Sequence, residues 1–367
     1  MIAIVCASFS VTPAGAAPVN WLPDADGFWD VVANWSSNPA LPGTVDDVTL
    51  DVGGTTVRTV THRSGTTTIN SLTSQENISL TGGTLSIAAA SSLAGLFSQS
   101  GGLLSGTGTL TVSGAASLGG GAMSGAGTTV LQGTSTLNAG AGTFILDAGR
   151  ILRNEGTLTW SGGTLALNST FGPGAGDIEN AAGAVFEATG NNILQASNVG
   201  GGDIGTDASF SNAGTFRKTT GTGTTTIGVA FDNTGTVDVQ SGTLNLSNGG
   251  SSSGIGTLEI AEGAVLQFGG GTHTVNDIAS AASAGELRVS AGTVNIGGAL
   301  THGGHLSVVG GTLNLTGTGA TATYAQSGGL LSGTGTLTVS GAASLGGGAM
   351  SGAGTTVLQG TSTLNAG

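Results

Sequence analysis

Short runs of alternating apolar and polar residues recur along the chain, each introduced by a glycine. In GTVDVQSGTLNL, which begins at Gly235, Val237 and Val239 point to one side and Asp238 points to the other. Alternation with a period of two is typical of a β-strand that buries one face. The pattern starts again after a corner at Gly242, so each unit predicts two short strands joined by a tight turn.

The two-strand unit repeats along the chain at a spacing close to 20 residues. Clear copies begin at Gly156, Gly235, Gly256, Gly285 and Gly304, and weaker copies at Gly183 and Gly214. The recurrent steps are 19 or 21 residues, and a fixed period of this size is the signature of a solenoid. Strands that recur at this period must hydrogen-bond to the coils above and below. We therefore expect an all-β parallel β-helix, or β-solenoid, of roughly 15 to 17 coils.

Three spacings are longer, and they predict extra loops within residues 166–174, 191–207 and 269–283. Loops on one flank of a solenoid commonly carry its binding specificity. Asn154, Asn212 and Asn233 each lie two residues before a glycine that opens a unit. Asparagine tolerates turn geometry, and stacked copies would satisfy the buried amides of a corner. We expect these turn asparagines to form an internal ladder.

One long segment occurs twice in identical form. Residues 99–140 are repeated letter for letter at 326–367. The identity indicates duplication of a large block, with an assembly error in the underlying sequence as the alternative. The first copy continues into AGTFILDAGRIL, whereas the second ends at Gly367, which predicts that the chain is an N-terminal fragment of a longer protein.

Composition and charge exclude several classes of partner. The chain has 71 glycines and only 7% charged residues, but its 38% hydrophobic content is unlike that of a disordered chain. The net charge is −13, and Lys218 is the only lysine. We expect no nucleic-acid partner, because binding to phosphates requires clustered Lys and Arg. No nucleotide-binding fingerprint occurs, and we expect no cofactor.

Residues 1–16 have the pattern of a secretory signal peptide, with an apolar run followed by small residues. No Lys or Arg precedes the run, and a buried N-terminal strand is the alternative interpretation. Cleavage would remove Cys6, the only cysteine, and leave a chain without disulfides. No later apolar run approaches the roughly 20 residues of a membrane span, so any membrane anchor is expected outside this sequence. The expected organisation is a signal peptide at 1–16, a cap with the first coils at 17–80, and solenoid repeats at 81–367.

Three of the four tryptophans, Trp21, Trp29 and Trp35, lie in one segment that differs from all the repeats. A solenoid exposes an unpaired apolar first coil unless something covers it. We expect this aromatic segment to be an N-terminal cap. The alternative is that the three indoles form a platform on which a sugar ring stacks.

The segments FWDVVANWSS and DDVTLDV, followed by rows such as GTLTVSG and NTGTVDVQSGTLNLS, resemble the passenger regions of bacterial autotransporter-type and filamentous-haemagglutinin-like surface proteins. The resemblance covers most of the mature chain. It implies a right-handed parallel β-helix that is secreted or held at the bacterial cell surface, associated with the outer membrane. It also implies a structural or adhesive stalk that makes multivalent contact with host or environmental surfaces, with glycans among the candidate ligands. The family's C-terminal translocator has no recognisable counterpart in these residues.

A carbohydrate-active enzyme is the alternative function, because β-helices also include polysaccharide lyases and hydrolases. The nearest carboxylate pairs are Asp203 with Asp207 and Asp177 with Glu179, both in predicted loops. A lyase also needs a basic residue and clustered calcium-binding aspartates beside its acidic substrate, and here the basic residues are scattered. Acidic residues in loops commonly serve turns and solubility, and we expect no catalysis.

Two further groups have partial ligand character. His302 and His305 have the spacing of metal ligands, but no third ligand accompanies them. Asp46, Asp47 and Asp51 could hold calcium, although aspartates at a strand edge also discourage unwanted pairing, which is the interpretation we prefer. We expect no bound metal. Threonines do not keep the regular register that binding to ice or crystalline polysaccharide would need.

Overall fold

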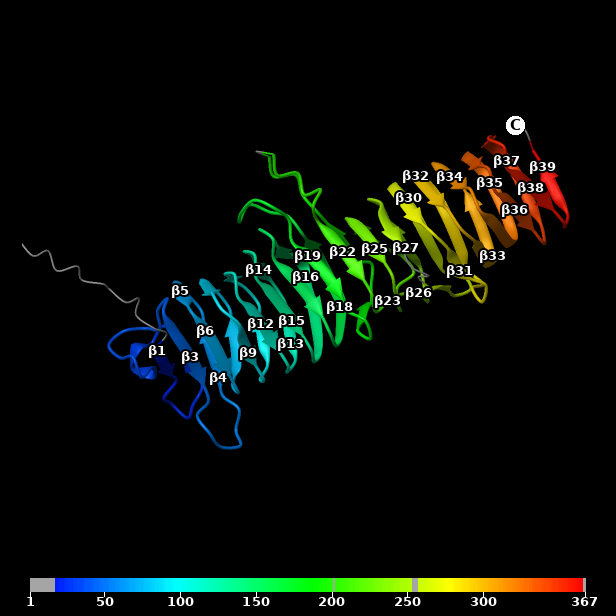
Figure 1. Cartoon of the computed structure of the whole chain (residues 1–367). Coiled ribbons are helices and arrows are strands. Elements are labelled where there is room, and N and C mark those ends of the chain that lie inside the picture. The colour runs from blue at the N-terminus through cyan, green and yellow to red at the C-terminus, as the bar shows by residue number, and fades with distance from the viewer. Residues whose placement is uncertain (1–16, 201, 253–256, 366–367) are drawn as a thin grey trace, which may run out of the picture.

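The computed structural model describes residues 17–200, 202–252 and 257–365, and the predicted signal peptide lies outside these residues. Parallel strands stack into a rod of about 15 turns, the β-solenoid predicted from the repeat (Figure 1). The only described helical element is a single 3-10 turn, η1 (Val32–Asn34). Each coil has three short strands, so the rod has three faces, which are named here the first, second and third face in chain order.

The strands divide among the faces as follows. The first face contains β1 (Ala17–Asn20), β3 (Asp46–Leu50), β6 (Ser71–Ser74), β9 (Ser91–Leu93), β12 (Thr109–Val112), β15 (Thr128–Leu131), β17 (Ile151–Asn154), β19 (Asp177–Asn180), β22 (Ser209–Asn212), β25 (Ala230–Asn233), β28 (Gly250–Ser252) and β34 (Thr312–Leu315). The second face contains β2 (Gly27–Phe28), β4 (Thr59–His62), β7 (Asn77–Leu80), β10 (Phe97–Gln99), β13 (Ala116–Leu118), β20 (Val185–Ala188), β23 (Thr215–Lys218), β26 (Thr236–Val239), β29 (Thr257–Ile260), β31 (Ile278–Ser280), β36 (Thr336–Val339) and β38 (Thr355–Leu358). The third face contains β5 (Thr66–Ile69), β8 (Thr84–Ile87), β11 (Leu103–Ser105), β14 (Gly121–Met123), β21 (Ile193–Gln195), β24 (Thr224–Gly228), β27 (Thr243–Leu246) and β39 (Ser362–Leu364).

Seven longer strands turn a corner and contribute to more than one face. They are β16 (Thr134–Leu146), β18 (Thr157–Ala166), β30 (Val265–Val275), β32 (Glu286–Ile296), β33 (Leu300–Val308), β35 (Thr318–Gly333) and β37 (Ala343–Met350). Pairing between coils is parallel and keeps the predicted step. Gln99 lies beside Leu118 on the second face, and Thr236 lies beside Thr257, which are steps of 19 and 21 residues.

Alternation within each strand builds one continuous hydrophobic interior. Val237 and Val239 are buried as predicted, and Leu244 and Leu246 are buried on the next strand. Glycine is required at the corner before Val237, because a Cβ on Gly235 would lie 2.0 Å from the carbonyl oxygen of Gly214 in the coil below. Packing this tight lets successive coils stack at the usual spacing between strands.

Aromatic side chains fill the interior in the middle of the rod. Rings from the first and second faces alternate there, with neighbouring centroids 5.0 to 6.2 Å apart, and they belong to Trp160, Phe186, Phe210, Phe216 and Phe231. All five side chains are buried. The three faces thus share one core rather than separate packing layers.

The predicted loop at 269–283 is wrong, because most of those residues are strand. Val265–Val275 is the single strand β30, and Ile278–Ser280 is β31. The long spacing arises because the two-strand unit moves to a different pair of faces. The unit from Gly256 occupies the second and third faces, whereas the unit from Gly285 occupies the third and first. A glycine at the start of a unit therefore predicts a corner of the coil, but it does not predict which of the three corners it is.

The two identical segments also lie on different faces of the rod, although their sequences are the same. In the first copy Gln99 pairs on the second face, whereas in the second copy Gln326 pairs on the third, beside Val308. The local contacts are nevertheless preserved. Gln99 Nε2 donates to the carbonyl oxygen of Ala122, and Gln326 Nε2 donates to that of Ala349, at 2.8 Å in both copies. A coil is thus specified by its own sequence, while its face depends on the length of chain before it.

Candidate functional site

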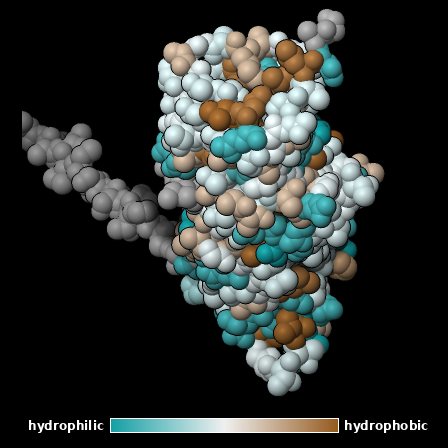
Figure 2. Space-filling view, turned by 90° about the vertical axis from the view of Figure 1, so that its right-hand side faces the viewer, coloured by the Kyte–Doolittle hydropathy of each residue, from teal (hydrophilic) through white to brown (hydrophobic). Residues whose placement is uncertain are grey.

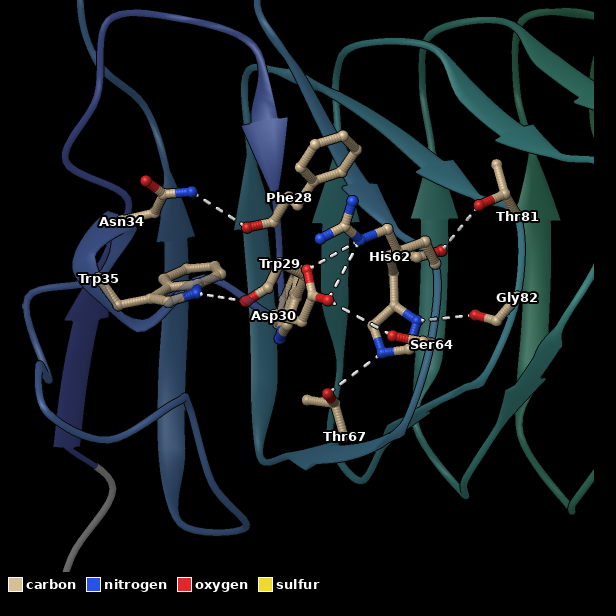
Figure 3. A network of polar contacts seen from close by, with 11 residues as sticks. Phe28, Trp29, Asp30, Asn34, Trp35, His62, Ser64, Thr67, Thr81 and Gly82 are labelled. Atoms are coloured by element: carbon tan, nitrogen blue, oxygen red, sulfur yellow. Dashed lines mark hydrogen bonds and ion pairs between the residues drawn. The ribbon is translucent and has the colours of Figure 1, made fainter.

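The three tryptophans of the N-terminal segment pack against one another at the first end of the rod. The ring centroids of Trp29 and Trp35 lie 4.7 Å apart, and those of Trp21 and Trp35 lie 5.0 Å apart. Trp35 Nε1 donates to the carbonyl oxygen of Trp29 at 2.8 Å (Figure 3). All three side chains are at least 98% buried. No indole face is open for a sugar to stack on, so the arrangement is that of a cap.

Polar contacts attach this cap to the first coils (Figure 3). The Arg63 guanidinium pairs with the Asp30 carboxylate at 3.1 Å and lies over the Phe28 ring, 3.6 Å from its centroid. The ring of His62 lies 6.0 Å from that of Trp29 and hydrogen-bonds through its two nitrogens to Thr67 and to a backbone carbonyl. The cap therefore combines buried rings with an ion pair at its rim.

The turn asparagines form a ladder inside the rod at the end of the first-face strands. Asn154 Nδ2 donates to Asn180 Oδ1 at 2.8 Å, Asn180 donates to Asn212 at 2.7 Å, and Asn212 donates to Asn233 at 2.7 Å. Asn180 was missed by the sequence analysis because no glycine follows it at the same spacing. All four side chains are buried. Three of them also donate to a backbone carbonyl of the next coil, so the ladder satisfies corner carbonyls on three coils.

Two of the predicted loops lie on the same edge of the rod. Residues 167–176 connect β18 to β19, and residues 196–208 connect β21 to β22, so both pass from the third face to the first in successive coils. In Figure 1 they project together from one side of the rod, drawn in green. Phe171 and Ile204 are about half exposed on these loops. This edge, residues 167–176 and 196–208, is named here the loop flank.

Asp203 and Asp207 join the two loops of the flank. Asp203 Oδ1 accepts from Asn168 Nδ2 at 2.8 Å, and Asp207 Oδ2 accepts from the Ala175 backbone N–H at 3.1 Å. An open hollow of about 370 Å³ lies between the loops, lined by Pro173, Gly174, Gly202, Asp203, Ile204, Thr206 and Asp207. The two carboxylates therefore have a structural task, which is to hold one loop against the next.

Asp177 and Glu179 lie on strand β19 rather than in a loop, which corrects the sequence prediction. Asp177 Oδ1 accepts from both the N–H and the hydroxyl of Ser209, at 3.0 and 2.7 Å. Burial raises the pKa of Asp177, and the negative charges of Asp207 and Glu179 add to the rise. Glu179 instead pairs with Arg153 at 2.8 Å. Each carboxylate of this pair is thus engaged by a neighbouring coil.

The two histidines with ligand-like spacing face different partners. His302 is buried, with Nδ1 2.9 Å from the Ser280 hydroxyl and Nε2 3.2 Å from the carbonyl oxygen of His305. His305 Nδ1 lies 2.9 Å from Thr323 Oγ1. Both nitrogens of His302 are therefore engaged inside the rod, and the two rings do not converge on a common point.

The aspartates near the N-terminus likewise act on local backbone and side-chain groups. Asp46 accepts from the backbone N–H of residue 43, Asp51 from that of residue 53, and Asp47 from the side chains of Asn70 and Ser71. Within residues 17–200, 202–252 and 257–365, no three His, Cys, Asp or Glu side chains are placed to hold a metal ion together.

Two buried cations escaped the sequence analysis. Lys218 is fully buried, and its ammonium donates to the carbonyl oxygens of Gly190 and Thr220 at 3.0 Å each. Arg150 is 1% exposed and donates from Nη2 to Thr129 Oγ1 at 2.6 Å. Burial lowers the pKa of Arg150 to about 10. Arg150 lies just before β17, outside the alternating residues, whereas Lys218 occupies an inward-facing position of β23, two residues after the buried Phe216, where an apolar side chain is the usual occupant.

The buried histidines predict acid sensitivity. Burial lowers the pKa values of His62, His273 and His302 below the ordinary value of 6.5. As the pH falls through 6.5, the histidines of the unfolded chain take up protons that those of the folded chain do not. The contribution of these histidines to the free energy of unfolding is therefore fully present above pH 6.5 and decreases below it. We expect the melting temperature to be lower at pH 5.5 than at pH 7.5, by roughly 2–4 °C for each kcal/mol by which the free energy of unfolding decreases. Calorimetry at both values tests this, and an equal or higher value at pH 5.5 would contradict it. The triple variant His62→Gln, His273→Gln, His302→Gln should show a smaller difference between the melting temperatures at the two pH values.

No helix in the described part of the chain is long and apolar enough to span a membrane. Comparison with protein families, with curated proteins and with solved structures gives no match.

Proposed function

We propose that the chain is an extracellular structural and adhesive rod that holds its loop flank away from a cell surface, of the kind found in bacterial autotransporter passengers. The observation that carries the proposal is the uninterrupted stack of coils around one core, with two consecutive long loops on a single edge. A stiff solenoid suits presentation at a distance, and weak contacts repeated over many rods sum to high avidity.

The chemistry of the loop flank favours neutral carbohydrate over acidic surfaces. Its hollow is lined by two carboxylates, those of Asp203 and Asp207, and by Ile204, while Phe171 exposes apolar surface on the neighbouring loop. The net charge of −13 repels acidic polysaccharides and anionic head groups unless a cation bridges them. We therefore place the adhesive contact at the loop flank, with neutral glycans as its ligand class.

Beads coated with the chain test this function on surfaces of cellulose, mannan and pectin. We expect retention on the neutral polymers, and roughly tenfold fewer retained beads for the double variant Phe171→Ser, Ile204→Ser, because avidity multiplies small losses per contact. Val309→Ser, an equally exposed apolar side chain on another part of the rod, is the matched control. Equal retention of all variants, preference for pectin, or release of sugar fragments from the polymer would overturn the proposal.

A further inference from the structure

A tight corner lies below the first loop of the loop flank, residues 167–176, in the preceding coil. It consists of residues 147–149, between β16 and β17, and it passes from the third face to the first as the two loops of the flank do. Ala148 has a φ of 55° there, and in the described part of the chain it is the one residue other than glycine with a positive φ. A residue keeps such a conformation where the surrounding structure fixes it. Residues 147–149 are named here the supporting turn.

The backbone of the supporting turn is hydrogen-bonded to the first loop of the flank. The Ala148 N–H donates to the carbonyl oxygen of Gly174 at 2.7 Å, and the Gly149 N–H donates to that of Ala175 at 3.1 Å. Asp147 and Ala175 form an antiparallel bridge, whereas the strands of these two coils pair in parallel. The second half of the loop is therefore attached to the coil below by its own backbone.

Asp147 adds a side-chain contact at the residue that carries the exposed ring. The Asp147 side chain is fully buried, and its Oδ2 accepts from the backbone N–H of Phe171 at 2.8 Å. Its other oxygen, Oδ1, accepts from the N–H of Ala148 at 2.9 Å. Hydrogen bonds to a carboxylate are about twice as strong as those between neutral groups. Asp147 thus fixes the backbone of Phe171 from the interior, while about half of Phe171 remains exposed.

The direction of the Phe171 ring depends on this backbone contact, because packing restrains a half-exposed ring only in part. On the side of the rod seen in Figure 2, hydrophobic residues likewise occur in small groups among polar ones. A loop that is already fixed in its bound conformation loses less conformational entropy on binding. A fixed backbone at Phe171 therefore increases the affinity of the loop flank for a ligand that contacts the ring.

We infer that Asp147 is a positioning residue of the loop flank, and that its carboxylate holds the backbone of Phe171 so that the ring is presented to the glycan. The inference rests on the proposed function, because it assigns to Asp147 a role in the same adhesive contact. Asp147 acts from the coil below without touching the ligand. From the coil above, Asp207 accepts from the Ala175 N–H, so the first loop is held between carboxylates of two other coils.

Amide hydrogen exchange at Phe171, measured on the full chain without glycan, tests the positioning step. In Asp147→Ala we expect this amide to exchange at least about tenfold faster, because it loses a hydrogen bond to a charged group. Asp147→Asn keeps one acceptor oxygen and should give a smaller increase, and it replaces the alanine variant if that variant does not fold. Asp277→Ala is the matched control, because the Asp277 carboxylate also accepts from a backbone N–H of the next coil, that of Ala299, at 2.6 Å. This control should leave the exchange at Phe171 unchanged.

Retention of coated beads on cellulose and mannan tests the link to the ligand. We expect roughly threefold fewer retained beads for Asp147→Ala, since a loop that must be ordered on binding loses affinity and avidity multiplies the loss. In the Phe171→Ser background Asp147→Ala should cause no further decrease, because the carboxylate acts through that ring. A role in general stability would instead lower retention by the same factor in both backgrounds.

Gly172→Ala disturbs the same support and leaves Asp147 unchanged. A Cβ at this position would lie 2.8 Å from the Cβ of Ala148, so the loop must move away from the supporting turn. It should likewise increase exchange at Phe171 and lower retention.

The inference alone is overturned by unchanged exchange at Phe171 in both Asp147 variants, by full retention of Asp147→Ala, or by an equal loss in the two backgrounds. Equal retention of Phe171→Ser and the unchanged chain also overturns it. If the double variant Phe171→Ser, Ile204→Ser is retained equally as well, the proposed function fails with it.

Discussion

An alanine in place of Phe210 should lower the free energy of unfolding of the surrounding coils by about 3 to 5 kcal/mol. The Phe210 side chain is fully buried, and its ring lies 5.0 to 5.6 Å from three others, those of Phe186, Phe216 and Phe231. Removal of the ring loses its burial and its edge-to-face contacts, and it leaves a cavity that stacked backbones cannot close. Because the ring bridges the first and second faces, the loss should extend to the coils above and below.

Native-state hydrogen exchange is the appropriate measurement, because long repeat arrays need not unfold in a single step. Amides of β19, β22 and β25 should exchange faster, whereas those of β5 and β8 should be unchanged. Phe171→Ala is the matched control, since that ring is about half exposed on the loop flank and its loss should change stability by no more than about 0.5 kcal/mol. An equal effect of the two substitutions would mean that the aromatic interior does not stabilise the rod.

An alanine in place of Asn180 is expected to cost about 2 to 4 kcal/mol. Asn180 Nδ2 donates to Asn212 Oδ1 and to the carbonyl oxygen of Thr215, and its own Oδ1 accepts from Asn154. The substitution leaves these buried partners short of a hydrogen bond, and each unsatisfied buried group costs about 1 to 3 kcal/mol. The effect should exceed that of a single lost hydrogen bond, because Asn180 lies in the interior of the ladder.

Asn314→Ala is the control for the ladder. Asn314 Nδ2 also donates to an asparagine of the neighbouring coil, Asn295, at 2.9 Å, but both side chains are only half buried. Water can replace that bond, and its loss should cost less than about 1 kcal/mol. Native-state hydrogen exchange compares the two variants, each in the coils around its own substitution. Similar losses of protection would show that the buried ladder contributes no more than the half-buried pair of Asn295 and Asn314.

Much of the fold follows from short-range sequence features. Alternation in segments such as Thr236–Val239 predicts strands with one buried face, because side chains on a strand point alternately to its two sides. The period near 20 residues then requires pairing between successive coils. The asparagines before the corner glycines predict a ladder, since identical residues at one register must lie above one another. These inferences are reliable because each depends on a few neighbouring residues.

The contacts of the candidate site were harder to predict from the sequence than the fold. Asp203 and Asp207 were placed correctly in a loop, but only the structure shows that they tie that loop to residues 167–176 of the coil below. His302 and His305 are three residues apart, yet a corner between them sends their rings to different partners. The burial of Arg150 depends on a glycine and a threonine more than 20 residues before it.

The amino-acid pattern alone thus specifies coils, corners and an internal stack, whereas the placement of each coil is a property of the assembled rod. Residues 99–140 and 326–367 are identical in sequence, yet Gln99 lies on the second face and its counterpart Gln326 lies on the third. The three corners are locally equivalent, so a sequence of this kind fits any of them. Its face is set by the accumulated length of all preceding coils, and that length is not encoded within the segment.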